Sequence, residues 1–102
     1  MAGLPMEQAA AALATVERAV TEVSQGLLQR RTFERRTDDA LEVVSACMQN
    51  LNATQSEVTR QRLIDTAEKA WIAALDEVPH HDVRTWVRPY VSKMEAIARG
   101  GA

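Results

Sequence analysis

Hydrophobic residues recur every three or four positions through most of the 102-residue chain, the spacing of one face of an α-helix. The most regular run lies near the N-terminus and follows a heptad pattern, which predicts a helix over residues 5–29 with one apolar seam. Pro5 suits the first position of this helix, and Gly26 is expected to weaken or end it. The seam consists of Met6, Ala9, Leu13, Val16, Val20, Val23 and Leu27.

This seam allows two arrangements. In one, the helix packs against the rest of its own chain, or against another copy after a swap. In the other, two chains form a coiled-coil homodimer. Ala12, Ala19 and Gly26 flank the seam where a specific dimer usually has opposed charges, which favours packing within the chain. The dimer seam would be Leu13, Val16, Val20, Val23 and Leu27.

A three-helix module is expected over residues 37–99, after the basic segment RRTFERR at residues 30–36. Thr37 and the two aspartates after it have N-cap side chains, and Glu42 follows Asp39 by three residues as in a capping box. The next helix is therefore expected to begin there and to extend to about Leu51.

The third helix is expected to begin at a capping box formed by Thr54 and Glu57 and to end before Pro79. Trp71 lies on its predicted apolar face, so we expect this side chain in the core. That face consists of Val58, Ile64, Ala67, Trp71, Leu75 and Val78.

Asp82 is expected to cap a fourth helix, in which Pro89 should cause a kink or delay the true start. Gly100 and Gly101 are expected to end it. Its apolar positions are Val83, Trp86, Val87, Tyr90, Met94 and Ile97. The sequence thus predicts one all-α domain over residues 1–102, either a four-helix arrangement or a three-helix domain with an N-terminal helical arm.

Composition agrees with a small helical protein, because only 4% of the residues are aromatic and the chain has 4 glycines and 3 prolines. The net charge of −2 gives no overall attraction to nucleic acid or to an anionic membrane. Cys47 is the only cysteine, which fits a reducing cytoplasm, and no apolar run approaches the ~20 residues of a membrane span.

The candidates for catalysis and metal binding are few. His80, His81 and Asp82 form the sequence HHD on a predicted turn, but this set does not supply the ligands that zinc requires. Asp76 and Glu77 are adjacent, so on a helix they point about 100° apart and do not form an acid–base pair. We therefore expect a protein that is not an enzyme and has no cofactor or metal.

Two kinds of surface remain. The aromatic and arginine residues of the last helix are typical of protein–protein interfaces, and we expect the partner to bind Trp86, Tyr90, Arg84 and Arg88. Alternatively, two basic patches would bind nucleic acid, with Phe33 stacked on a base. The first patch is Arg30, Arg31, Phe33, Arg35 and Arg36, and the second is Arg84, Arg88, Lys93 and Arg99.

Large residues are regularly spaced from Trp71 to Tyr90 around Pro79. This spacing, through Leu75, Val83 and Val87, resembles the second helical hairpin of phage replication proteins that load or inhibit the replicative helicase.

The resemblance covers residues 37–98, and Pro89 departs from the family pattern. It implies a phage-derived, truncated or specialised member without the disordered helicase-binding tail. Such a protein would bind and block or bridge a larger bacterial protein of the replication machinery.

Overall fold

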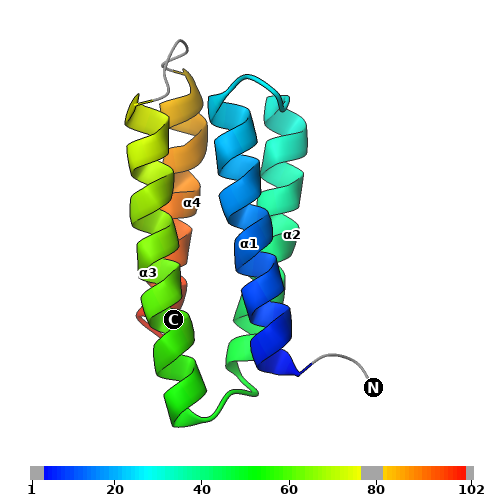
Figure 1. Ribbon diagram of the computed structural model, residues 1–102, viewed down its shortest axis with the longest axis vertical. Helices are drawn as coiled ribbons and strands as arrows, with labels where there is room; N and C mark the ends of the chain where they lie inside the picture. The colour runs from blue at the N-terminus through cyan, green and yellow to red at the C-terminus, as the bar shows by residue number, and fades with distance from the viewer. Residues whose placement is uncertain (1–3, 77–81, 101–102) are drawn as a thin grey trace.

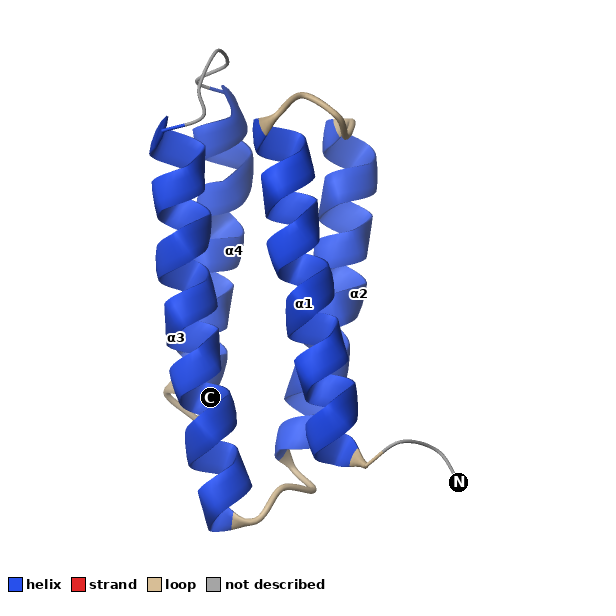
Figure 2. Cartoon of the chain, in the orientation of Figure 1, coloured by secondary structure: helices blue, strands red, loops and turns tan. Residues whose placement is uncertain are grey.

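The computed structural model describes residues 4–76 and 82–100, and every regular element within them is an α-helix (Figures 1 and 2). The helices are α1 (Pro5–Ser24), α2 (Arg30–Met48), α3 (Ala53–Asp76) and α4 (Asp82–Ala98). The predicted all-α class is therefore confirmed. The N-terminal helix belongs to the four-helix arrangement and is not a separate arm.

The four helices form two antiparallel hairpins, one of α1 and α2 and one of α3 and α4 (Figure 1). α1 packs against both α2 and α3, whereas α2 and α3 lie diagonally across the bundle. Alternate helices run in the same direction, so the contact between α1 and α3 is parallel. The short link between α2 and α3 thus crosses from one corner of the bundle to the opposite one.

α1 contributes its heptad seam to the core of its own chain. Leu13, Val16, Val20 and Val23 are each at most 2% exposed. In this fold they are therefore not available as the seam of a coiled-coil dimer. Leu27 was the fifth residue of that seam, but it lies beyond the end of the helix and is 69% exposed.

Gly26 ends α1, as the sequence predicted. Its φ of +77° lies in the left-handed region, where a side chain would cause strain. The Gly26 N–H donates to the carbonyl of Val23 at 3.1 Å, and the Leu27 N–H donates to the carbonyl of Glu22 at 2.8 Å. These two bonds form a Schellman motif, which satisfies carbonyls at the end of the helix.

The predicted start of the second helix was wrong. α2 begins at Arg30, so the basic segment 30–36 forms its first two turns, and Thr37 is buried inside the helix. The cause is Phe33, which is fully buried one turn before Thr37 and on the same face as Leu41. Burial of this aromatic side chain stabilises the two extra turns by more than the cap at Thr37 to Asp39 would contribute.

The cap of α3 lies at Asn52, two residues before the predicted Thr54, and the inward face of the helix also differs. Asn52 Oδ1 accepts from the N–H of Gln55 at 2.8 Å, while Gln55 Oε1 accepts from the N–H of Asn52 at 3.2 Å. These reciprocal bonds form the actual capping box. The buried positions of the helix are Thr59, Leu63, Thr66, Ala67, Ala70 and Ala74.

The predicted apolar face of α3 was therefore largely wrong. Val58, Ile64 and Leu75 are 51%, 44% and 40% exposed, and Trp71 is half-buried. α3 packs against α1 and α4 at once, and small residues on its inner face let both helices approach closely. Val78 and Pro79 lie outside the described residues.

α4 continues through Pro89 without a new start. The proline lies on the exposed side of the helix, as does Thr85, whose carbonyl loses its usual donor there. Gly100 has a φ of +114°, and its N–H donates to the carbonyl of Ile97 at 3.2 Å, so it ends the helix as predicted. Gly101 lies outside the described residues.

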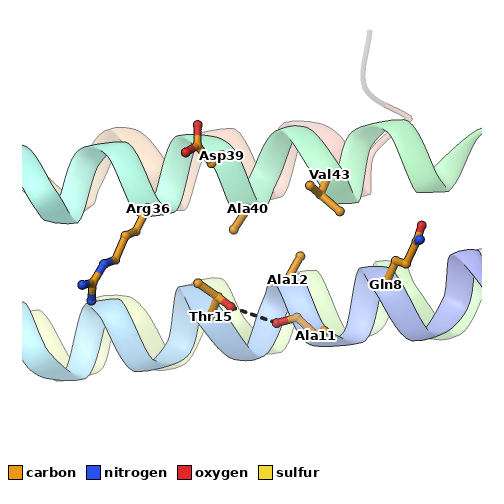
Figure 3. A pocket seen from close by; sticks show the side chains of 8 residues that line it. All are labelled: Gln8, Ala11, Ala12, Thr15, Arg36, Asp39, Ala40 and Val43. Carbon is orange, nitrogen blue, oxygen red and sulfur yellow. Dashed lines mark hydrogen bonds between the residues drawn. The ribbon is translucent and has the colours of Figure 1, made fainter. Parts of the chain in front are cut away.

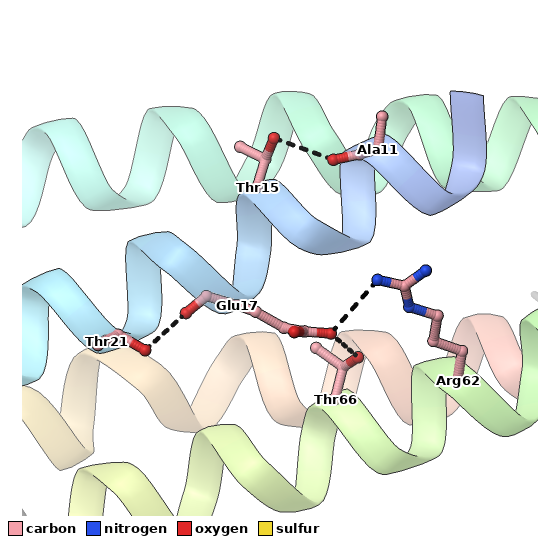
Figure 4. Close-up of polar contacts among 6 residues, drawn as sticks. All are labelled: Ala11, Thr15, Glu17, Thr21, Arg62 and Thr66. Atoms are coloured by element: carbon pink, nitrogen blue, oxygen red, sulfur yellow. Dashed lines mark hydrogen bonds and ion pairs between the residues drawn. The ribbon is translucent and has the colours of Figure 1, made fainter. Parts of the chain in front are cut away.

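A polar link connects the two hairpins. Thr66 Oγ1 on α3 donates to Glu17 Oε1 on α1 at 3.2 Å, and Arg62 Nη2 lies 3.8 Å from the same oxygen (Figure 4). Thr66 is buried, while Glu17 and Arg62 are partly exposed. The link joins Glu17 on α1 to Thr66 and Arg62 on α3, and so favours one alignment of the two parallel helices along their length.

Candidate functional site

Trp86 and Tyr90 lie on the side of α4 that faces α2. The Arg30 guanidinium lies 5.6 Å from the centre of the half-buried Trp86 ring, a cation–π geometry. Tyr90 is only 8% exposed and packs edge-on against Phe33, with ring centres 5.4 Å apart. Partner binding by Tyr90 and base stacking by Phe33 both require an exposed ring, and neither ring is exposed, because both fill the space between α2 and α4.

The Tyr90 hydroxyl donates a hydrogen bond to the Glu34 carbonyl oxygen at 3.5 Å. Burial, and then the nearby carboxylates of Asp38 and Glu34, raise the pKa of Tyr90 to about 12. The phenol therefore keeps its proton further into the alkaline range than an exposed tyrosine does, and its ring packs between α2 and α4.

Arg84 and Arg88 lie on the opposite side of α4, facing α3. Arg84 Nη2 donates to the Leu75 carbonyl oxygen at 3.4 Å. The Arg88 guanidinium lies 5.6 Å from the centre of the Trp71 ring. Together with Thr85 these residues line an open cleft of about 340 Å³.

The four residues predicted to bind a partner therefore do not form one surface. Trp86 and Tyr90 belong to the contact between α4 and α2, whereas Arg84 and Arg88 border α3. Residues two positions apart on a helix point in widely different directions, so this separation follows from helical geometry.

Beside Arg84 and Arg88 runs a line of large, partly exposed side chains on α3, here called the α3 ridge. Its aliphatic members are Ile64, Ile72 and Leu75, which are 44%, 54% and 40% exposed. Glu68 is exposed and Trp71 is half-buried under Arg88. The α3 ridge comprises Ile64, Glu68, Trp71, Ile72 and Leu75.

The sequence interpretation missed this ridge because it assigned three of its members to the core. The sequence did contain a signal for the correct face. Threonine and alanine recur at helical spacing from Thr59 to Ala74, and such small residues mark a face that packs closely against other helices.

The four arginines of the basic segment 30–36 are exposed on the first two turns of α2, and two of them have acidic neighbours. Arg30 pairs with Glu34 at 3.2 Å, and Arg36 lies 3.8 Å from Glu22. Arg31 and Arg35 are exposed. Because Phe33 is buried, the first predicted nucleic-acid patch has no aromatic side chain for stacking on a base.

The second predicted patch is also divided. Lys93 lies toward α2, where it pairs with Asp38 at 3.5 Å, while Arg84 and Arg88 face α3. Arg99 directly precedes Gly100, and its side chain is exposed. The cations of the last helix therefore do not form one continuous phosphate-binding face.

A second concave feature lies between α1 and α2, here called the α1/α2 groove (Figure 3). It has a volume of about 620 Å³, and its floor is mostly small and apolar. Arg36 and Asp39 stand on its α2 wall. The lining residues are Gln8, Ala11, Ala12, Thr15, Arg36, Asp39, Ala40 and Val43.

The part of the chain that the structure describes contains no group of three or more His, Cys, Asp or Glu side chains placed to hold a metal ion. His80 and His81 of the HHD sequence lie outside that part, and Asp82 is the first residue of α4. The Cys47 thiol is buried and donates to Gln8 Oε1 at 3.6 Å. None of the four described helices combines the length and the hydropathy of a membrane span.

Comparison of the chain with protein-family models, with curated proteins and with solved structures returned no match. The α3 ridge with its two arginines, and the α1/α2 groove, are therefore interpreted from their own geometry and chemistry.

Proposed function

We propose that this protein is a small non-catalytic interaction module that docks the α3 ridge, together with Arg84 and Arg88, on a larger protein. The observation that carries the proposal is the row of exposed aliphatic side chains beside the stacked Trp71 and Arg88. Contiguous exposed apolar side chains rimmed by charges are typical of surfaces that a partner covers.

The composition of the surface supports a protein partner. Tryptophan and arginine are the residues enriched in binding hot spots, and here Arg88 already lies over the ring of Trp71. The aliphatic residues need an apolar surface opposite them, and the two guanidinium groups favour carboxylates at its edge. The expected partner therefore offers an apolar groove bordered by acidic side chains.

For the partner class, we propose a bacterial replication protein, with the replicative helicase as the first candidate. The support is the spacing from Trp71 to Tyr90, which resembles phage helicase loaders and inhibitors. The mechanism would be occlusion or bridging, since it requires only that one face of this molecule covers a face of the partner.

The test compares capture by the tagged protein and by two variants from nuclease-treated and untreated halves of a bacterial lysate, followed by titration of the purified replicative helicase. Ile72→Asp places a charge in the middle of the α3 ridge. Val58→Asp is the matched control, because Val58 is an exposed aliphatic residue on α3 outside the ridge. We expect Ile72→Asp to weaken binding at least tenfold, as is common for hot-spot residues, and Val58→Asp to bind like the wild type.

Equal binding by the wild type and Ile72→Asp would contradict the proposal that the α3 ridge is the docking face. Absence of helicase binding, with another protein retained, would contradict only the proposed partner class. If capture disappears after nuclease treatment, nucleic acid is the partner. Its affinity should then fall by about one log unit per log unit of salt for each phosphate neutralised.

A further inference from the structure

The α3 ridge and the α1/α2 groove are complementary in shape. The ridge presents large aliphatic side chains that stand out from α3, while the small residues Ala11, Ala12 and Ala40 are among those that line the groove. Helices pack by inserting a ridge of side chains into a groove between neighbouring residues. Each molecule thus has both kinds of surface, on different helices.

We propose that the α1/α2 groove binds the α3 ridge of a second copy of this chain. The inference rests on the proposed function only in taking the α3 ridge as a binding surface. It names a specific occupant for the groove, chosen because the two surfaces match in charge as well as in shape.

The match in shape and charge appears when α3 of one copy is aligned in parallel with α2 of the other copy in one particular register. Positions 68, 71, 72 and 75 of α3 have the same spacing as positions 36, 39, 40 and 43 of α2, which are the α2 residues of the groove. This register places Ile72 over Ala40 and Leu75 beside Val43. One pair of a large and a small side chain, Ile72 with Ala40, and one pair of exposed large aliphatic side chains, Leu75 with Val43, therefore form at the centre of the contact.

The same register pairs opposite charges. Glu68 would meet Arg36, and the Arg88 guanidinium over Trp71 would meet Asp39. Within the described chain no ion pair involves Glu68 or Asp39, and Arg36 has only the partly exposed contact to Glu22 at 3.8 Å. The contact thus supplies ion-pair partners for two carboxylates that have none among the residues the structure describes.

Such a contact joins two different surfaces, so it is heterologous. After one contact forms, each end of the pair still presents a free ridge or a free groove, and further copies add to a closed ring or an open chain. A protein partner that binds the α3 ridge competes with the next copy for it. Self-association would therefore hide the docking face until the partner displaces the neighbouring groove.

The test is sedimentation velocity over protein concentrations from micromolar to about 1 mM, which covers weak specific contacts. We expect the wild type to form species larger than a monomer as concentration rises. Ile72→Asp removes the ridge, and Ala11→Arg fills the groove at an exposed position with a good helix former, so each variant alone should remain monomeric. Val58→Asp should associate like the wild type.

An equal mixture of Ile72→Asp and Ala11→Arg provides the decisive arm. One variant retains an intact groove and the other an intact ridge, so the mixture should form dimers and nothing larger. A monomeric wild type at every concentration, a mixture without dimers, or a self-associating Ala11→Arg would each overturn the inference. Because Ala11→Arg keeps the α3 ridge, partner capture by this variant shows whether the proposed function stands when self-association fails.

Discussion

At the scale of single residues, burial of aromatic rings decides which candidate functional residues are surface groups. Phe33 and Tyr90 are of residue types that are common in binding sites, yet they pack edge-on against each other inside the bundle. Sequence spacing could place Tyr90 on the inner side of its helix. It could not show that Phe33 comes from a helix that begins two turns earlier than its cap signals suggest.

The buried Tyr90 hydroxyl makes stability depend on pH in the alkaline range. Its pKa is raised from 10.0 to about 12, so the unfolded chain loses this proton at a lower pH than the folded chain does. The stabilisation is complete below about pH 10 and is lost as pH rises toward 12, by up to roughly 2–3 kcal/mol. Urea unfolding at a series of alkaline pH values measures this decline.

Tyr90→Phe provides the control for that decline, because it keeps the ring and removes the ionisable group. We expect the variant to lose less stability than the wild type between pH 10 and 12. Since Tyr90 is the only tyrosine, tyrosinate absorbance in the native protein reports its pKa directly. A native-state value near 10, or parallel declines for both proteins, would contradict this assignment.

At the scale of elements, the ends of the helices were partly predictable. The role of Gly26 follows from the requirement for a left-handed residue at the end of a helix, and that of Gly100 likewise. The predicted start of α3 was two residues too late, because Thr54 with Glu57 and Asn52 with Gln55 both satisfy a capping pattern. Which face of α3 turns inward depends on how closely α1 and α4 approach it. The hydrophobic pattern of α3 alone does not reveal these distances between helices.

Gly26→Ala tests the end of α1. A side chain there meets no atom within 4 Å, so the cost arises only from the backbone conformation at a φ of +77°. We expect a loss of about 1 kcal/mol in the free energy of unfolding, measured by chemical denaturation. Gln25→Ala is the control, because Gln25 has a φ of −89° and should tolerate the change. An unchanged stability in Gly26→Ala would show that the turn does not depend on glycine.

At the scale of the whole molecule, the all-α class and the four helices followed from periodicity, but the arrangement of the hairpins did not. Helices next to each other in sequence are often neighbours in a bundle, yet here α2 and α3 lie on a diagonal. The choice depends on the fit between α1 and α3, including the polar link of Glu17 with Thr66. This fit is a property of two contacting helix faces, and the periodicity of each helix alone does not determine it.

The link between the hairpins is tested by a double-mutant cycle. Thr66→Val removes the hydroxyl that donates to Glu17, and we expect a loss of about 1 kcal/mol in unfolding free energy. The same change should cost little in a Glu17→Ala background, because the acceptor is already gone. Equal costs in both backgrounds would show that the hydrogen bond contributes nothing.

Thr37→Val is the matched control for this cycle. Thr37 is also fully buried, but its Oγ1 has no hydrogen-bond partner in the described chain. Replacing that hydroxyl with a methyl group should therefore preserve stability or increase it.

The two-hairpin topology also has a kinetic consequence. Within each hairpin the contacting helices are joined by a short link, so these contacts close small loops at little entropic cost and are expected to form quickly. The parallel contact between α1 and α3 spans a longer stretch of chain and should form last, when the two preformed hairpins dock. In unfolding the order reverses, so the lifetime of the native state should depend mainly on how slowly the hairpins separate.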